Sequence, residues 1–309
     1  MDGFINLDKP IGPTSFKMVD KARKLTGQKK VGHTGTLDPG ASGVLPLCVG
    51  RATKLAVFLV DSNKTYRAEI TFGITTDTQD RYGRILRTKK AEMDRKRLEE
   101  MLRQFRGPIM QLPPMYSAVR QGGKKLYELA REGLEVERKS RKIEVYRLDL
   151  ADYLPPDRAV IEVECSKGTY IRTLCNDIGE KLGCGAIMSS LTRLSVGDFS
   201  LDSAVTLKEL EEAAKDGNWA KYLLPIDYPL KHMPKVFIRD KYVKLALNGN
   251  NLYDHNLLTN NKEFNHLQQL RLYYRSTFLG IYSYHSDTQP SYFRANRLLA
   301  DGVEVKQYS

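Results

Sequence analysis

The spacing of hydrophobic residues along the chain predicts a mixture of helices and strands. Apolar residues recur with the helical period in three runs, which cover 16–25, 92–106 and 169–182. Strand-like alternation or short apolar runs occur in six segments, which cover 3–7, 66–72, 143–150, 159–165, 268–275 and 277–284. Thr14 or Ser15 can cap the first helix, and Gly27 can end it. Gly107 follows the second helical run as its end signal.

These elements follow one another without a regular β-α-β order. This order predicts an α+β fold with a mixed, largely antiparallel sheet. Segment 223–229 contains two prolines and indicates a linker. Beyond it asparagines become frequent and strand-like runs follow, so we expect a small β-rich domain over 231–309 after a large domain over 1–228. A length of 309 residues fits this division.

The chain is basic, with a formal net charge of +12. Such a surplus favours polyanionic partners, of which RNA and DNA come first. Nine Lys or Arg residues and five Glu residues lie between Arg120 and Arg147, and we call 120–147 the basic segment. It fits either a solvated helix face with ion pairs or a mobile arm that closes over a phosphate backbone. In the second case Gly122-Gly123 would serve as the hinge.

Several classes of protein are disfavoured by what the sequence lacks. The four cysteines form no C-x-x-C pair, so reduced, buried thiols are expected rather than a zinc site or a disulfide framework. They are Cys48, Cys165, Cys175 and Cys184. The N-terminus has no apolar signal-peptide core, and no stretch approaches the roughly 20 apolar residues of a membrane span. We therefore expect a soluble, cytoplasmic protein, and without nucleotide-loop or metal motifs we expect no cofactor and no metal ion.

The most informative segment is 31–45, in which one acidic residue, Asp38, stands among glycines. Four glycines surround it, namely Gly32, Gly35, Gly40 and Gly43. Glycines allow positive φ and close approach of a ligand, whereas Pro39 stiffens the loop. The spacing alone leaves two interpretations open. Asp38 either caps a tight turn or holds a carboxylate ready to meet a ligand.

This segment resembles the catalytic motif of the tRNA pseudouridine synthases of the TruB family, Gly-His-X-Gly-X-Leu-Asp-Pro-X-Ala-X-Gly-Val-Leu. The matching residues are Gly32, His33, Gly35, Leu37, Asp38, Pro39, Ala41, Gly43, Val44 and Leu45. In that family the aspartate is the essential catalytic residue, so the resemblance implies this role for Asp38. It also implies that His33 fills the space that the flipped base leaves in the RNA.

Four further segments match the family in the expected order, and they cover 64–67, 113–118, 166–174 and 191–194. The resemblance implies that Tyr66 stacks on the target base and that its hydroxyl could serve in proton transfer. It also implies that Tyr170 and Arg172 line the active site and that Leu191 forms part of its floor. Arg172 would be the partner of Asp38, since a nearby guanidinium favours an ionised carboxylate.

Two more residues of the matching regions, Asp80 and Arg193, are expected near the RNA substrate by the same resemblance. Each candidate also has a purely structural interpretation. Both tyrosines could be core aromatics, His33 a loop histidine and Asp80 a turn cap, and Arg172 could form a structural ion pair.

The implied reaction converts uridine at position 55 in the T loop of tRNA into pseudouridine, without guide RNA. It breaks the N1–C1′ bond, rotates the uracil and joins C5 to C1′, which requires no cofactor. The tRNA would be the only partner of a monomeric protein, and by its position the C-terminal domain is PUA-like. Two alternatives remain at this point: a guide-RNA-dependent relative, which lacks the basic segment, and a non-catalytic tRNA-binding module, which has no need of Asp38.

Overall fold

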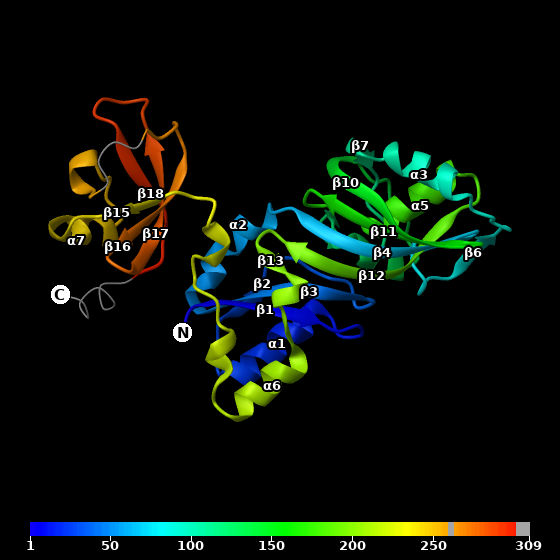
Figure 1. Ribbon diagram of the computed structural model, residues 1–309, viewed down its shortest axis with the longest axis horizontal. Coiled ribbons are helices and arrows are strands. Elements are labelled where there is room, and N and C mark those ends of the chain that lie inside the picture. The colour runs from blue at the N-terminus through cyan, green and yellow to red at the C-terminus, as the bar shows by residue number, and fades with distance from the viewer. Residues whose placement is uncertain (259–262, 301–309) are drawn as a thin grey trace.

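One large sheet organises most of the chain (Figure 1). The computed structural model describes residues 1–258 and 263–300. Across the sheet the strands follow the order β14 (Val205–Thr206), β1 (Gly3–Lys9), β3 (Ala41–Val49), β12 (Ala186–Val196), β4 (Lys64–Phe72), β11 (Arg158–Cys165), β10 (Arg141–Leu154) and β7 (Gly107–Gln111). Two short strands join it, namely β2 (Val31–His33) against β3 and β13 (Phe199–Ser200) against β12.

The sheet is mixed and largely antiparallel, which confirms the fold class predicted from the sequence. Its parallel pairs are β1 with β14 and β3 with β12. In the second pair Ala41 lies opposite Leu191. The antiparallel pairing of β12 with β4 then places Arg193 opposite Tyr66. Three segments that are far apart in the sequence therefore meet in the middle of the sheet.

Helices pack at both ends of this sheet (Figure 1). Near β1, α1 (Ser15–Thr26) packs against α6 (Leu207–Lys215). Toward the other end, α5 (Ile171–Lys181) packs on β12 and β4, and α3 (Arg95–Arg103) packs on β10. Shorter elements complete the large domain: α2 (Ala56–Val60), α4 (Leu126–Arg131), the hairpin of β5 (Ile74–Thr76) and β6 (Ile85–Thr88), and the hairpin of β8 (Arg120–Gln121) and β9 (Lys124–Lys125).

Local signals account for the ends of the helices. The Thr14 hydroxyl accepts a hydrogen bond from the Lys17 N–H, and Gly27 adopts a left-handed conformation with φ 66°, so α1 begins and ends as predicted. Helix α3 is shorter than the run 92–106. Asp94 caps its start, and residues 104–106 bond to carbonyls three residues back in a tighter turn.

Strand β3 lies between two apolar clusters. Leu45 and Leu47 belong to the larger cluster, which also holds side chains of α1, α3 and α5. Val44 and Cys48 belong to a second cluster on the opposite face. All four cysteines are buried and free, as the sequence analysis predicted.

The C-terminal part forms a small sheet in the order β15 (Lys235–Phe237), β16 (Gln269–Tyr274), β17 (Thr277–His285) and β18 (Tyr292–Leu298), with α7 (Val243–Leu247) beside it (Figure 1). It has an apolar cluster of its own. Tyr273 and Phe278 of this sheet also join the second cluster behind β3. The two domains therefore share an apolar contact.

Segment 223–229, which the sequence analysis interpreted as a linker, is held on both sides. The backbones of Leu224 and Phe4 exchange two hydrogen bonds of 2.8 and 3.0 Å. Asp227 accepts hydrogen bonds from Arg271 at 2.9 Å and from the Tyr273 hydroxyl. The prolines end regular structure here, yet these tertiary bonds fix the segment to both domains.

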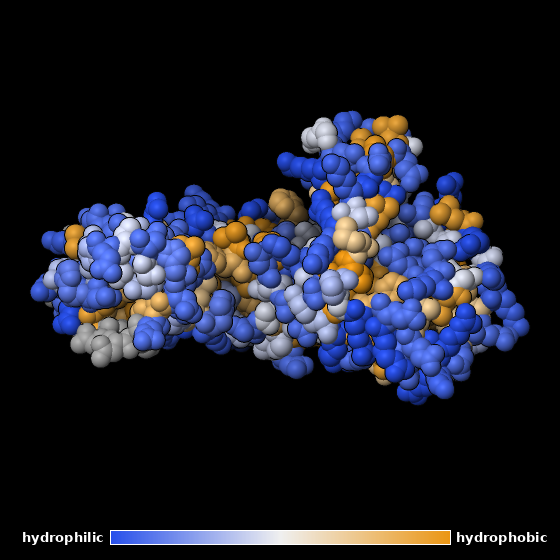
Figure 2. Space-filling view, turned by 90° about the horizontal axis from the view of Figure 1, so that it is seen from above, coloured by the Kyte–Doolittle hydropathy of each residue, from blue (hydrophilic) through white to orange (hydrophobic). Residues whose placement is uncertain are grey.

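Hydrophilic residues cover most of the face seen in Figure 2, and apolar residues form scattered groups between them. Over the part of the chain that the structure describes, no helix is long and apolar enough to cross a membrane.

Candidate active site

The Asp38 loop, residues 34–40, connects β2 to β3 and is held on both sides of its carboxylate. The Ser15 hydroxyl accepts a hydrogen bond from the Leu37 N–H at 2.8 Å and donates to the Leu37 carbonyl at 2.9 Å. The Gly12 N–H donates to the Pro39 carbonyl at 2.8 Å. The Asp38 side chain itself stays 46% exposed. The loop therefore presents a carboxylate on a fixed backbone.

Two buried cations lie beneath this loop. Arg193 donates to the carbonyls of Val44 at 2.7 Å, Gly35 at 3.2 Å and Thr36 at 3.3 Å. Lys9 donates to the Ala41 carbonyl at 2.6 Å. Burial lowers the pKa of Lys9 to about 8; the Asp38 charge opposes this shift, and the Arg193 charge adds to it. Arg193, expected beside the substrate, thus lies inside the protein and braces the loop.

Arg172, in the first turn of α5, links two carboxylates. Its side chain is 8% exposed, and Nη2 lies 2.9 Å from Oδ2 of Asp38. Nη1 lies 3.6 Å from Oδ2 of Asp80. Nη2 also donates to the Tyr116 carbonyl at 2.9 Å. Asp38, Arg172 and Asp80 therefore form one charged chain, which orients the exposed carboxylate toward a buried guanidinium.

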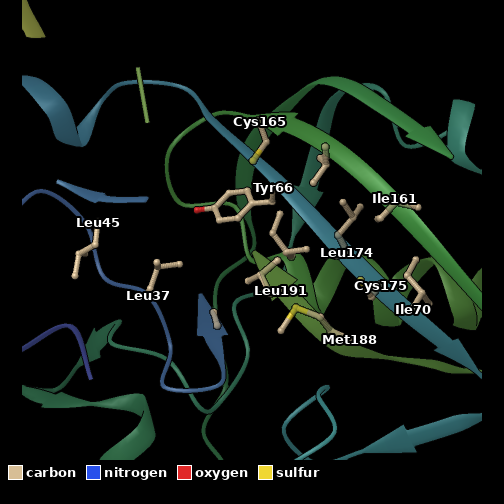
Figure 3. Close-up of a cluster of buried hydrophobic side chains, with 14 of the residues drawn as sticks. Leu37, Leu45, Tyr66, Ile70, Ile161, Cys165, Leu174, Cys175, Met188 and Leu191 are labelled. Atoms are coloured by element: carbon tan, nitrogen blue, oxygen red, sulfur yellow. The ribbon is translucent and has the colours of Figure 1, made fainter. Parts of the chain in front are cut away.

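Tyr66 lies next to these charged side chains, within the larger apolar cluster (Figure 3). Figure 3 shows its ring near Cys165 and Leu191, with the hydroxyl directed toward the side of Leu37 and Leu45. Burial raises the pKa of Tyr66, whereas the nearby Arg193 charge opposes the rise and the Asp38 charge adds to it. The phenol is therefore protonated at neutral pH and sits within electrostatic reach of Asp38.

His33 and Tyr170 are half-buried at the edges of this arrangement. Burial and the Arg193 charge lower the pKa of His33, so its imidazole is neutral near pH 7. Tyr170 precedes α5, and its backbone N–H and carbonyl bond to the Gln111 side chain at 2.8 and 3.0 Å. These bonds fix the start of the helix that carries Arg172.

The first part of the basic segment forms the β8–β9 hairpin and α4. Gly122 and Gly123, with φ 56° and 86°, form the turn of the β8–β9 hairpin. Lys124 pairs with Glu132 at 3.2 Å, as on a solvated face with ion pairs. Five other cations of the segment are exposed and, within residues 1–258 and 263–300, form no ion pair; they are Arg120, Arg131, Lys139, Arg141 and Lys142. These remain available to an anionic partner.

The structure thus brings Asp38, Tyr66, Arg172 and Leu191 together, and Asp80 joins them through Arg172. Sequence reasoning missed three contributors, namely Lys9, Ser15 and Gln111. Periodicity cannot find them, because a buried lysine or a serine that bonds to a distant loop looks the same in sequence as an exposed one. In the described part of the chain, no group of three or more His, Cys, Asp or Glu side chains could hold a metal ion. The expectation that no metal takes part remains a prediction.

Comparisons with known proteins show which families the chain resembles. Residues 23–171 match the model of the TruB family pseudouridylate synthase N-terminal domain, and residues 172–231 match that of the tRNA pseudouridylate synthase B C-terminal domain. The chain is 49% identical over 258 residues to tRNA pseudouridine synthase B of Alkaliphilus oremlandii, covering 84% of this chain and 85% of that protein. It is 48% identical over 255 residues to tRNA pseudouridine synthase B of Bacillus pumilus, covering 81% and 82%.

Two solved structures share the fold. A chain of a Cbf5–Nop10–Gar1 complex matches with a TM-score of 0.75 and 26% identity, over 97% of this chain and 85% of that one. A chain of an H/ACA RNP bound to a substrate RNA that contains 2′-deoxyuridine matches with the same TM-score and 24% identity, over 96% and 85%.

Proposed function

Because the chain belongs to the TruB family of tRNA pseudouridine synthases, which are isomerases, we propose that it converts uridine 55 in the T loop of tRNA into pseudouridine. It does so as a monomer in the cytoplasm, without guide RNA and without a cofactor. The observation that carries this proposal is the placement of Asp38. A half-exposed carboxylate stands on a loop held from below, with a buried guanidinium 2.9 Å away.

The reaction requires a carboxylate that acts on the ribose. The N1–C1′ bond breaks, the uracil rotates, and C5 joins C1′; the proton on C5 leaves, and N1 gains one. Asp38 is the acidic group that the loop presents, and Arg172 holds it in place. Tyr66 stacks on the uracil, and its hydroxyl takes part in the proton transfer from C5. The direction of the hydroxyl, toward the side of Leu37 and Leu45, supports this second role (Figure 3).

The target base must leave its stack before Asp38 can reach the ribose. Enzymes that act on bases flip them out at a cost of a few kcal/mol. Stacking on Tyr66 offsets part of this cost, since one base–aromatic contact contributes roughly 1–3 kcal/mol. Leu191 supports the uracil from below, and the neutral His33 fills the space left in the RNA. Tyr170 and Asp80 line the rim, and Arg193 positions the loop from inside.

Two further parts bind the tRNA away from Asp38. The basic segment contacts phosphates through its exposed cations, among them Lys139 and Lys142. Residues 231–309 act as a PUA-like RNA-binding domain beside a catalytic domain of residues 1–228. The shared cluster behind β3 supports this division, because it packs the small sheet against the strand that follows the Asp38 loop.

A guide-RNA-dependent activity is the second candidate, because the chain shares its fold with an H/ACA RNP protein. Identity in sequence favours the stand-alone enzyme, since it reaches 49% with tRNA pseudouridine synthase B and 26% with the chain of the Cbf5 complex. The exposed cations of the basic segment also favour the stand-alone enzyme, because the protein can contact the tRNA phosphates through them.

One experiment separates these candidates. The purified protein is incubated with an unmodified T-arm stem-loop, and the modified bases are mapped. We expect pseudouridine at a single uridine without any added guide RNA. Modification that requires a guide RNA would identify the second candidate, and binding without any product would identify a tRNA-binding module instead.

A further inference from the structure

Tyr82 is an aromatic residue at the rim of the Asp38 loop that neither the sequence motifs nor the proposed chemistry uses. It lies in the turn between β5 and β6 and is 65% exposed. Its ring lies against Gly40, two residues after Asp38. A Cβ at position 40 would come within 3.1 Å of Cζ and 3.2 Å of Cδ2, and closer still to Cε2. The ring is thus seated on the loop that carries the carboxylate.

The turn that carries Tyr82 is tied to the active site at several points. The Tyr82 N–H donates to Oδ1 of Asp80 at 2.9 Å, and Oδ2 of the same carboxylate faces Arg172. The Thr173 hydroxyl donates to Oε1 of Gln79 at 2.7 Å. The backbone also bonds to Met188 of β12 in both directions, through Gln79 and Arg81. Tyr82 therefore belongs to the same bonded unit as Asp38 and cannot be regarded as a loose surface side chain.

We propose that Tyr82 is a second stacking platform, which receives a nucleobase adjoining the target uridine. This inference rests on the proposed function, and it names a contact that the proposed mechanism does not contain. When the target base leaves the stack, its neighbour loses a stacking partner as well. An exposed ring beside the Asp38 loop can replace that partner, because stacking on an aromatic ring accepts any base.

The charges around the ring fit a nucleic acid. The guanidinium carbon of Arg81 lies 5.8 Å from the ring centroid, a distance typical of a cation–π contact. Arg81 and Arg84 are both exposed on this turn and can contact the phosphates on either side of a stacked base. Because 65% of the Tyr82 surface is exposed, a base can reach the ring beside these cations.

The first test measures affinity for the unmodified T-arm stem-loop in an Asp38→Asn background, so that no turnover interferes. We expect Tyr82→Ala to weaken binding about 10-fold, and Tyr82→Phe to bind like the parent because it keeps the ring. Tyr82→Leu should behave like Tyr82→Ala. Ile85→Ala is the matched control, because Ile85 is an apolar residue of the same hairpin that is also exposed, at 59%, but follows the turn that carries Tyr82. It should leave the affinity unchanged.

The second test places a fluorescent ring at the proposed platform. The chain has one tryptophan, Trp219, which is buried. In a Tyr82→Trp variant, the added fluorescence should be quenched when the stem-loop binds, whereas an Ile85→Trp variant should show no such quenching. Stacking also predicts that Tyr82→Ala raises KM about 10-fold in the Asp38-containing enzyme, with kcat within a few fold.

The proposal is overturned if Tyr82→Ala binds the stem-loop as tightly as the parent, or if Tyr82→Leu restores full affinity, which would make the ring a simple apolar cover. It is also overturned if Tyr82→Ala lowers kcat together with thermal stability and leaves affinity unchanged. Failure of the proposed function has a different signature. The unsubstituted enzyme would then form no pseudouridine, while the affinities of the Tyr82 variants would still decide whether a base stacks there.

Discussion

The tightest backbone approach at the active site is at Gly43, where β3 meets β12, and it gives a quantitative prediction. Gly43 has φ 102°, and it pairs with Arg193 in the parallel register. An added Cβ would lie 2.8 Å from the Arg193 nitrogen and 3.0 Å from its carbonyl carbon, and closer still to its oxygen. All three are backbone atoms, so no side chain can rotate away. Gly43→Ala must therefore widen the gap between β3 and β12.

Two contributions determine how much unfolding free energy Gly43→Ala loses. A residue with a Cβ at positive φ costs roughly 1–2 kcal/mol. Overpacking of a fixed backbone typically costs about 1–3 kcal/mol more. We expect Gly43→Ala to lower the free energy of unfolding by about 2–5 kcal/mol, a large part of the stability of an ordinary domain. Turnover should fall about 100-fold, since a shift of about 1 Å at a reacting group costs that much.

Urea unfolding and initial rates on the T-arm stem-loop check both numbers, and Gly217→Ala is the matched control. Gly217 also has positive φ, at 67°, but a Cβ there would have no neighbour within 4 Å. The control should lose only about 1–2 kcal/mol of unfolding free energy and should keep its turnover. If both variants lose the same stability and Gly43→Ala turns over normally, the close contact with Arg193 does not constrain the Asp38 loop.

Three further predictions concern chemistry and binding. Asp38→Asn should abolish turnover and leave RNA affinity within a few fold, because the amide keeps the shape but cannot ionise. Residual activity above about 1% would contradict a rise of several kcal/mol in the activation barrier. Tyr66→Phe should bind RNA normally yet turn over at least about 100-fold more slowly, and Tyr66→Leu should lose binding as well; full activity in both, with only lower thermal stability, would make Tyr66 a core residue. Replacing four lysines of the basic segment by glutamine should weaken tRNA binding and reduce the log–log salt slope by roughly 0.9 for each lost phosphate contact; an unchanged slope would mean a merely solvated face. The four are Lys124, Lys125, Lys139 and Lys142.

Local structure could be predicted from the sequence because its causes are local. The hydroxyl of Thr14 and the left-handed Gly27 set the ends of α1, and both lie within one turn of the helix. The alternation that begins at Tyr66 predicted a strand, and β4 spans Lys64–Phe72. The end of α3 was predicted too late, because the run of apolar residues continues into a turn whose side chains still face the core.

The assembly of the site has non-local causes. The resemblance indicated Arg172 as the partner of Asp38, but nothing in the sequence indicated that Asp80 would share the same guanidinium. The burial of Arg193 was equally hidden. It follows from the parallel pairing of β3 with β12, which brings the loop carbonyls over its side chain. A pattern of residues along one strand contains no information about which strand lies beside it.

The position of β3 between two apolar clusters links the candidate active site to the small C-terminal sheet. Leu45 and Leu47 of this strand pack into the larger cluster, while Val44 and Cys48 pack into the second cluster. Phe278 of the small sheet belongs to the second cluster as well. The packing of the small sheet and the position of the strand that follows Asp38 are therefore linked through one shared cluster. A substitution that loosens this cluster is expected to shift the loop that carries the carboxylate.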